Sequence, residues 1–358
     1  MVRFIVRRLL LSIPVLLGII FIVFALARII PGDPCRASLG ERATDAACND
    51  FIHRYGLDQP IPVQFVSYIG QLLSGDLGQS IKFSRPVTTV LVERLPTTIE
   101  LTFYALLIAT VFGVLLGLLS ALRRNSPIDV VTMVGANLGV SIPVFVLGLL
   151  LAYLFAIVLK DTPLALPPSG RLSADVTIKP LAESWGLQGL TGLPRGILDF
   201  VSNIYTLNAL VTFQWDALVD AVRHLILPAF ALATIPMAII ARMTRSSILD
   251  VLGLDYIRTA RAKGLREGLV IRRHALRNAM LPVVTIVGLQ LGGLLAGAVL
   301  TETIFNLSGV GRTMYEAITG RDYVVIQGFT LVIALGYLAV NLAVDVSYAA
   351  LDPRVRLN

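Results

Sequence analysis

The chain has 358 residues, 56% of them hydrophobic and only 15% charged, and its mean hydropathy is +0.79. A single soluble core could not bury so much apolar surface, so the composition excludes an ordinary soluble domain and predicts a protein that crosses a membrane several times. The formal net charge of +7 does not indicate nucleic-acid binding, because the sequence has no basic patch interleaved with aromatic residues.

Six apolar stretches are long enough to cross a bilayer, which requires roughly 20 apolar residues in a helix. We therefore predict an all-α polytopic membrane protein with six transmembrane helices. In chain order the predicted spans are residues 9–30, 98–122, 130–159, 224–241, 281–300 and 324–351. The first is too long for a signal peptide and lacks a small-residue cleavage site, so we expect it to be retained. Kinks are indicated at Pro143, Pro228 and Pro236.

The distribution of positive charge predicts how the spans are oriented. The short segments that flank the spans are basic, with Arg3, Arg7 and Arg8 near the start, Arg123 and Arg124 after the second span, and Arg354 and Arg356 near the end. Because short basic segments stay in the cytoplasm, both termini and residues 242–280 are predicted to be cytoplasmic. The near-neutral segments 31–97 and 160–223 are predicted to lie on the outer side.

The predicted outer segments divide the chain into two parts. Residues 1–97 comprise the first span and an outer segment, in which apolar residues between positions 63 and 73 recur at helical spacing and predict an amphipathic helix. Residues 98–358 comprise a five-helix core with an outer insertion (160–223) and a cytoplasmic loop (242–280). Within the insertion we expect short helices, with the rings of Trp185 and Trp215 near the lipid headgroups.

The two cysteines, Cys35 and Cys48, both lie in the first predicted outer segment. They either form a disulfide that closes a small loop or remain free thiols, and an oxidising outer compartment favours the disulfide. A metal site is not expected, because two thiols without a nearby pair of histidines do not provide four ligands.

Catalytic motifs are missing from the sequence. We find no G-x-x-x-x-G-K-[ST] phosphate-binding loop, no H-E-x-x-H zinc motif and no G-x-S-x-G nucleophile turn. The three histidines, His53, His224 and His274, belong to separate segments, so we assign them structural roles. The chain is therefore predicted to have no enzymatic activity and to bind no cofactor directly.

The loop at residues 242–280 has nine Lys or Arg residues and three Asp or Glu residues. Gly264 separates two helical runs within it, which predicts a helix, a turn and a second helix. We expect Tyr256, Ile257 and Ala260 to offer an apolar face to a partner, inside a rim of basic side chains. The alternative is a loop without a partner, whose charge follows only from its cytoplasmic position.

The strings RTARAKGL (258–265) and RRHALRNAMLPVV (272–284) resemble the cytoplasmic coupling loop of ABC-importer permeases of the peptide/nickel family, in its dipeptide and oligopeptide B-type branch. Nearly the whole chain shares the resemblance, through PGDP (31–34), GDLGQS (75–80), LPPSGR (166–171), ETIF (302–305), GVGR (309–312), RDY (321–323) and the terminal DPRVR. In the family motif E-A-A-x-x-x-G, Arg258 and Thr259 here replace Glu and the first Ala. Leu307, Ser308 and Val324 also depart from the usual Trp, Pro and Pro.

This resemblance implies the subunit of an importer in a bacterial or archaeal cytoplasmic (inner) membrane. A homologous second permease would complete the pathway within the membrane lipid, an extracytoplasmic binding protein would deliver the substrate, and two ATPase subunits would bind ATP-Mg. The residues implied in coupling to the ATPases are Asp255, Tyr256, Ile257, Arg258, Ala260, Arg261, Lys263 and Gly264. Peptides are the substrate we expect, while related permeases carry nickel chelates, haem or glycosides.

Polar residues within the spans are candidates for the pathway, because lipid does not solvate them. They are Asn137, Ser141, Gln290, Glu302, Asn341 and Asp345. Packing between helices explains such residues equally well. A stand-alone secondary transporter, a membrane-embedded enzyme and a passive channel are further alternatives, but the sequence has neither evident internal repeats nor a catalytic constellation to favour them.

Overall fold

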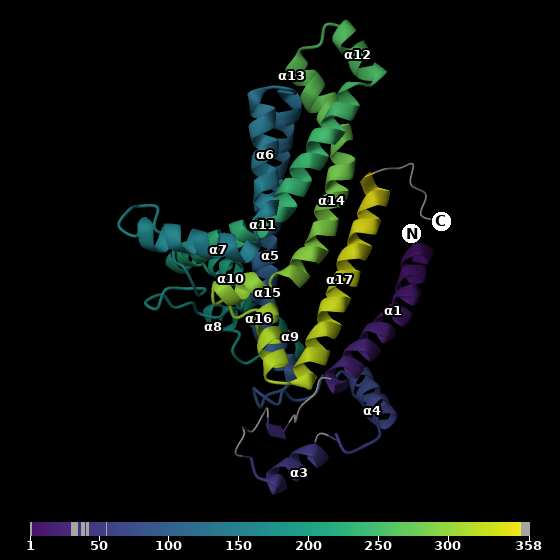
Figure 1. Cartoon of the computed structure of the whole chain (residues 1–358), viewed down its shortest axis with the longest axis vertical. Coiled ribbons are helices and arrows are strands. Elements are labelled where there is room, and N and C mark those ends of the chain that lie inside the picture. Colours follow the sequence, from purple (N-terminus) through teal and green to yellow (C-terminus); the bar gives the residue numbers. More distant parts are fainter. Residues whose placement is uncertain (1, 30–34, 37–39, 41–42, 55, 352–358) are drawn as a thin grey trace.

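The computed structural model describes residues 2–29, 35–36, 40, 43–54 and 56–351. Helices dominate these residues, and their only β-pairing is an isolated bridge between Gln79 and Pro86. The molecule is elongated, with α12 at one extremity and α3, α4 and α16 towards the other (Figure 1). We refer to these as the α12 end and the α16 end. The Pro-Gly-Asp-Pro turn at 31–34 and the basic C-terminal residues lie outside the described part.

Among the described residues, five unbroken helices are long and apolar enough to cross a membrane. They are α1 (Val2–Ile29), α5 (Val87–Leu122), α11 (Trp215–Leu252), α14 (Leu276–Gly297) and α17 (Tyr323–Leu351). They confirm five of the six predicted spans, although α5 and α11 have 36 and 38 residues and extend well beyond their apolar stretches. A helix is held by backbone hydrogen bonds, which polar residues make as well as apolar ones. An apolar run therefore predicts only the part of a helix that faces lipid or protein, and the helix can extend beyond it.

The third predicted span, residues 130–159, is not one straight helix. It consists of α6 (Pro127–Ser141), α7 (Val144–Tyr153) and the π-helical η1 (Leu154–Val158), with a bend of 102° between α6 and the α7–η1 unit. Ile142, with φ −82° and ψ 123°, is extended because the ring of Pro143 disfavours the helical conformation in the preceding residue. Counted as one broken span, this bent pair brings the number of candidate spans among the described residues to the predicted six, and the effect of Pro143 is stronger than the expected kink. Pro228 and Pro236, by contrast, lie inside the continuous α11.

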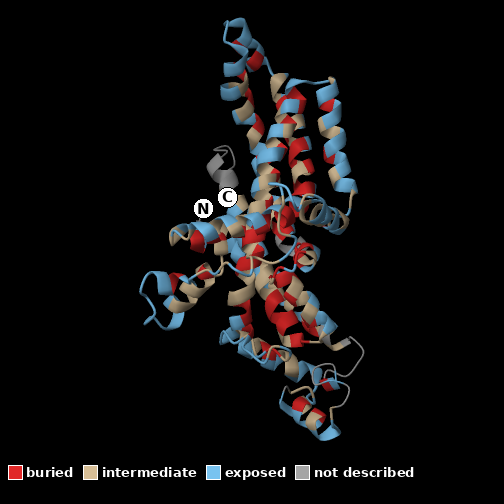
Figure 2. Cartoon of the chain, turned by 90° about the vertical axis from the view of Figure 1, so that its left-hand side faces the viewer, coloured by how far each residue is buried: buried red, intermediate tan, exposed pale blue. Residues whose placement is uncertain are grey.

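The helix α11 is the centre of the bundle, since 72% of its most apolar stretch is buried (Figure 2). It packs along α5, where two glycines allow a close approach. A Cβ atom at Gly113 would lie 2.8 Å from the Met237 carbonyl, and one at Gly117 would lie 2.5 Å from the Ala241 carbonyl. Small residues at a helix–helix contact bring backbones together in this way in membrane proteins.

Helix α1 lies at the edge of the bundle beside α17 (Figure 1), and only 11% of its most apolar stretch is buried. Large apolar side chains on it remain exposed, among them Leu10 at 59% and Phe21 at 56%. The outer surface of α1 is therefore suited to lipid or to another hydrophobic protein surface.

Short helices occupy the α16 end. They are α3 (Asp45–Arg54), α4 (Ile61–Leu73), α8 (Leu181–Ser184), α9 (Gly192–Ser202), α10 (Tyr205–Val211), α15 (Val299–Ile304) and α16 (Val310–Thr319). The amphipathic helix predicted near residue 63 is confirmed as α4. Cys35 and Cys48 form a disulfide with a Cα–Cα distance of 5.4 Å, and both pack with Phe51.

Polar contacts fasten the insertion at residues 160–223 to the bundle. The buried Glu100 of α5 accepts hydrogen bonds from Arg171 Nη2 at 2.8 Å and from the backbone and side chain of Thr206, each at 2.7 Å. The Arg171 guanidinium also stacks on Tyr205, 3.5 Å from the ring centroid. The insertion contains the short helices that the sequence predicts, and these bonds hold it against the first half of α5.

Candidate functional site

The connection between α11 and α14 projects from the bundle at the α12 end (Figure 1). After α11, α12 (Asp255–Ala262) is followed by α13 (Glu267–Leu269), which continues through the π-helical η2 (Val270–Ala275) into α14. Gly264 has φ +75°, the left-handed conformation that often ends a helix. The helix, turn and second helix that we predicted are confirmed, but α11 and α14 account for much of the predicted loop.

Two apolar side chains anchor α12 to its own chain. Ile257 is 0% exposed and Ala260 is 7% exposed, and both pack against Val270 and Ala275 of η2. The prediction that Ile257 and Ala260 face a partner was therefore wrong. Their spacing of three residues does mark an apolar face, but η2 covers that face within the same chain.

Hydrogen bonds brace the same projection. Arg261 makes two bonds to Glu267, at 3.0 and 2.6 Å, and these bonds raise the pKa of the Arg261 guanidinium, so it stays charged. The Tyr256 hydroxyl accepts a bond from Asn278 Nδ2 at 2.8 Å and donates to the His274 carbonyl at 3.4 Å. These contacts, added to the apolar anchor, make α12 a rigid projection instead of a loose loop.

The remaining coupling candidates form the exposed face of α12. The side chains of Asp255 and Arg258 are 94% and 74% exposed and lie 3.3 Å apart, and Lys263 at the end of the helix is also exposed. Gly264 continues this surface, with no atom within 4 Å of where its Cβ would be. The face available to a partner is thus charged and polar, with both signs of charge.

An ion pair at the base of the projection was missed in the sequence. Arg245 of α11 donates from Nε and Nη2 to the two carboxylate oxygens of Asp129 on α6, at 2.8 Å each. The Ser120 hydroxyl of α5 also donates to Asp129. The three residues join three helices just below the projection, and no local pattern marks them because they come from distant parts of the sequence.

The pathway candidates do not gather at one place. Asn137 and Ser141 lie on α6 and are exposed, and the side-chain carbonyl of Asn137 accepts a bond from Arg242 at 3.3 Å. Asp345 of α17 forms an ion pair with Arg8 of α1, 3.0 Å apart. This pair helps to join the edge helix to the bundle.

The other two candidates on the long helices, Gln290 of α14 and Asn341 of α17, are half-buried. Their helices, α14 and α17, are neighbours, and α1 lies on the other side of α17 (Figure 1). Their partial exposure leaves them available to water or to a second protein, in contrast to a residue of the core.

Glu302 does not line a path in this structure, which corrects its place among the candidates. It is 0% exposed and accepts hydrogen bonds from the Thr98 hydroxyl of α5 at 2.6 Å and from the Arg312 amide of α16 at 2.9 Å. Thr98 Oγ1 in turn accepts the Val310 amide at 2.8 Å. Because a helix start has free N–H groups, Glu302 and Thr98 together cap α16 and bind it to α5.

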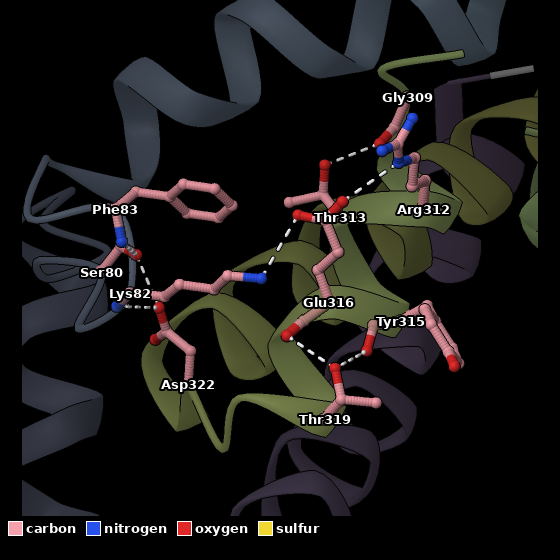
Figure 3. Close-up of polar contacts among 10 residues, drawn as sticks. All are labelled: Ser80, Lys82, Phe83, Gly309, Arg312, Thr313, Tyr315, Glu316, Thr319 and Asp322. Atoms are coloured by element: carbon pink, nitrogen blue, oxygen red, sulfur yellow. Dashed lines mark hydrogen bonds and ion pairs between the residues drawn. The ribbon is translucent and has the colours of Figure 1, made fainter. Parts of the chain in front are cut away.

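A second buried carboxylate holds the beginning of α17 (Figure 3). Asp322 is 0% exposed and accepts bonds from the Ser80 hydroxyl at 2.5 Å and the Lys82 amide at 3.0 Å. Beside it, Glu316 of α16 contacts Lys82 Nζ at 3.4 Å and Arg312 Nε at 3.0 Å. The RDY string noted in the sequence contains this aspartate, but its partners could not be read from the string.

Within the described residues, no three His, Cys, Asp or Glu side chains are arranged to hold a metal ion. The arrangement as a whole offers a rigid projection at one end, a polar cap of short helices at the other, and exposed apolar helices between them.

The sequence matches two family models that together cover nearly the whole chain. Residues 113–357 match the family described as binding-protein-dependent transport system inner membrane component, and residues 1–102 match the N-terminal part of such membrane components.

Individual proteins are also similar over their full length. The dipeptide transport system permease protein DppB of Alkalihalophilus pseudofirmus is 43% identical over 99% of this chain and 100% of that protein. The protein of the same description from Escherichia coli strain K12 is 44% identical over 99% of each chain, and the di/tripeptide permease protein of Pseudomonas aeruginosa is 43% identical over 99% of each. A solved amino acid ABC transporter with histidines aligns with 15% identity and a TM-score of 0.44, covering 75% of this chain and 95% of that one.

Proposed function

The chain belongs to the family of binding-protein-dependent transport system inner membrane components, and we propose that it forms half of the translocation pathway of an ATP-driven peptide importer. The observation that carries this proposal is the end-to-end identity of 43–44% with permease proteins whose names specify dipeptides or di- and tripeptides. No observation favours nickel chelates, haem or glycosides as the substrate, nor a stand-alone secondary transporter.

The α12 projection is the part that would receive the ATPase subunits. Its support is structural: Asp255, Arg258 and Lys263 are exposed, while Ile257 is fixed in the core of the projection. A projection that is braced internally transmits a push without deforming, and an exposed face with both signs of charge suits a specific partner. ATP-Mg would be bound by those subunits and not by this chain.

We further propose that the α12 end is cytoplasmic, with both termini on that side. The support is the excess of basic residues around α12, nine against three acidic residues over 242–280, together with the near neutrality of the α16 end. The α16 end then faces the binding protein that delivers the peptide.

A second permease would cover the exposed side of α1, α14 and α17. These helices bury only 11%, 22% and 33% of their most apolar stretches, against 72% for α11. The half-buried Gln290 lies on α14 and the half-buried Asn341 on α17. We therefore propose that the pathway runs between these helices and the second permease. Asn137, Ser141 and Asp345 are retained as further candidates, whereas the buried Glu302 is not.

The test is transport by the purified complex. The chain is reconstituted with its ATPase subunits and second permease in liposomes, and the binding protein supplies a labelled dipeptide. We expect uptake with ATP and none with a non-hydrolysable ATP analogue. Uptake of a nickel chelate, haem or a glycoside, with none of di- or tripeptides, would assign the importer to another substrate. Peptide uptake that continues without the ATPase subunits would overturn the coupling.

A further inference from the structure

A cavity of about 470 Å³ lies at the α16 end, between the end of α1, the amphipathic α4 and the beginning of α17. Its walls include Arg28 from α1, Gln64 and Tyr68 from α4, and Gln327 from α17. The three helices converge at this end of the molecule (Figure 1). The cavity is separate from the α12 projection and contains none of the pathway candidates.

Arg28 is a half-buried cation whose partners are all neutral. Its Nε donates to Gln64 Oε1 at 2.8 Å, its Nη1 donates to the Phe24 carbonyl at 3.2 Å, and its guanidinium carbon lies 3.4 Å from the centroid of the Phe24 ring. Within the described residues, no carboxylate forms an ion pair with it. A cation removed from water without a counter-ion is unfavourable, so the site favours the arrival of an anion.

The guanidinium is also held in place. Gln64 donates from Nε2 to the Gln59 carbonyl at 2.7 Å and to the Leu57 carbonyl at 3.3 Å, which orients its Oε1 towards Arg28. Aromatic packing fixes the other side, because Phe24 contacts Phe65 of α4 with their ring centroids 5.1 Å apart. A positioned guanidinium loses little further freedom when it binds an oxyanion.

Two neutral donors accompany Arg28. Gln327 is 6% exposed, and its Nε2 has no hydrogen-bond partner among the described residues. Tyr68 is 8% exposed, and burial raises the pKa of its hydroxyl to about 12, so it stays protonated and can donate. A buried donor without an acceptor costs free energy until a ligand supplies one.

The charged groups of the wall are positive in balance. Arg28 and Arg54 line the cavity, and among the described residues of its wall the one acidic side chain is Asp76, whose Oδ1 accepts the Gly78 amide at 2.8 Å. His53 contacts Asp58 at 2.8 Å. The cavity is therefore complementary to an anion.

The position of the cavity indicates which anion reaches it. Helix α4 is too short to cross a bilayer, yet Val63 and Val66 on it are 48% and 70% exposed, and Phe21 and Ile22 of α1 are each 56% exposed. The cavity therefore adjoins exposed apolar surface on both α1 and α4, an arrangement expected near the level of the lipid headgroups. Phosphate is the abundant anion of lipid headgroups, and a guanidinium binds phosphate through charge-assisted hydrogen bonds.

We propose that this cavity binds a phosphate group, either the phosphodiester of an anionic phospholipid or free phosphate, with Arg28 as its counter-ion and Tyr68 and Gln327 as neutral donors. The bound phosphate joins α1, which is otherwise loosely held, to α4 and α17. The inference does not depend on which substrate the importer carries.

The test is lipid binding by the full chain, purified with the subunits that accompany it and stripped of lipid in a neutral detergent. Phosphatidylglycerol, diacylglycerol with the same acyl chains, and inorganic phosphate are added separately, and native mass spectrometry counts the bound molecules. We expect one phosphatidylglycerol to bind in preference to diacylglycerol, and Arg28→Gln to bind it about tenfold more weakly. Arg195→Gln is the matched control, because Arg195 pairs with Asp199 and does not line the cavity.

The two sources of phosphate give different results. If millimolar inorganic phosphate binds or competes in an Arg28-dependent manner, the ligand is the free ion; if only phosphatidylglycerol does so, the ligand is the lipid. Gln64→Glu is a second variant of nearly the same size: it places a carboxylate beside the Arg28 Nε, although it loses the two bonds that Gln64 Nε2 donates, and we expect the same loss of binding. Equal binding of phosphatidylglycerol by the wild type and both variants, with no effect of phosphate, would overturn the proposal.

Discussion

The α12 projection and the α16 end both consist of short helices, but they are held in different ways. In the projection, Ile257 packs against Val270 and Ala275, and Arg261 bonds to Glu267, so the contacts join residues that are close in sequence. At the α16 end, Glu302 and Thr98 are 204 residues apart and Asp322 and Ser80 are 242 residues apart. The projection is a local unit on top of the bundle, whereas the α16 end is part of the tertiary fold itself.

This difference has a mechanical consequence. A local unit can be displaced by a partner together with the ends of α11 and α14, because its own contacts are not broken by the movement. The α16 end cannot move freely against α5, since its buried carboxylates would lose their partners at considerable cost. Substitutions at the α16 end should therefore lower the free energy of unfolding of the whole chain. Substitutions in the projection should change only its local stability or its binding to a partner.

The largest effect is expected for Asp322→Ala. The Ser80 hydroxyl and the amides of Lys82 and Val325 would lose their acceptor, and we expect the free energy of unfolding to fall by about 4 kcal/mol. Denaturant unfolding in detergent, followed by tryptophan fluorescence, measures the change. Asp216→Ala, at an exposed position of α11, is the control and should change stability by less than about 0.5 kcal/mol. Equal effects of the two would show that the buried bonds are unimportant.

Gly309→Ala tests the close packing at the start of α16. A Cβ atom at Gly309 would lie 2.3 Å from the Glu302 carboxyl carbon, so the substitution should displace Glu302 and cost about 3 kcal/mol. The same unfolding measurement applies. Gly293→Ala is matched in chemistry, but no atom lies within 4 Å of its Cβ position, and it should not destabilise the protein. If Gly309→Ala is as stable as Gly293→Ala, the contact between Glu302 and α16 is not formed.

Ile257→Ala should act on the projection alone. Removing this buried side chain leaves a cavity against η2, and we expect a local cost of about 2 kcal/mol. Hydrogen exchange should then be faster in the amides of α12 and unchanged in α5 and α16, because the projection opens as a separate unit. Faster exchange throughout the bundle would contradict its independence.

The smallest effect on stability is expected for Arg258→Ala. Its side chain is 74% exposed, so unfolding should change by no more than about 0.5 kcal/mol. Binding of the ATPase subunits should weaken by about fivefold, or ~1 kcal/mol, if Arg258 contacts them. Surface plasmon resonance with the purified ATPase subunits provides the measurement, and Arg195→Ala at the other end is the control. Unchanged affinity would remove Arg258 from the docking face.

The sequence predicted most of the elements but not their final arrangement. Apolar runs located five spans, and helical spacing located α4. Gly264 correctly marked the turn after α12. These successes share a cause, because helix length, amphipathicity and a left-handed glycine all depend on neighbouring residues.

What failed depended on packing. The spacing of Ile257 and Ala260 revealed an apolar face, but not that η2 of the same chain would cover it. The polarity of Glu302 suggested a pathway, although its carboxylate is enclosed by Thr98 and Arg312. Asp129 and Arg245, which are 116 residues apart, gave no sign of their ion pair.

By itself, the sequence determined a membrane protein of long helices, its resemblance to importer permeases and the presence of a helical basic projection, because composition and periodicity are local properties of the chain. Only the tertiary structure decided the ion pair between Asp129 and Arg245 and the partners of the buried carboxylates Glu302 and Asp322. Each of these is set by atoms that meet only when distant segments pack together, and the free energy of that packing is not encoded in any one segment.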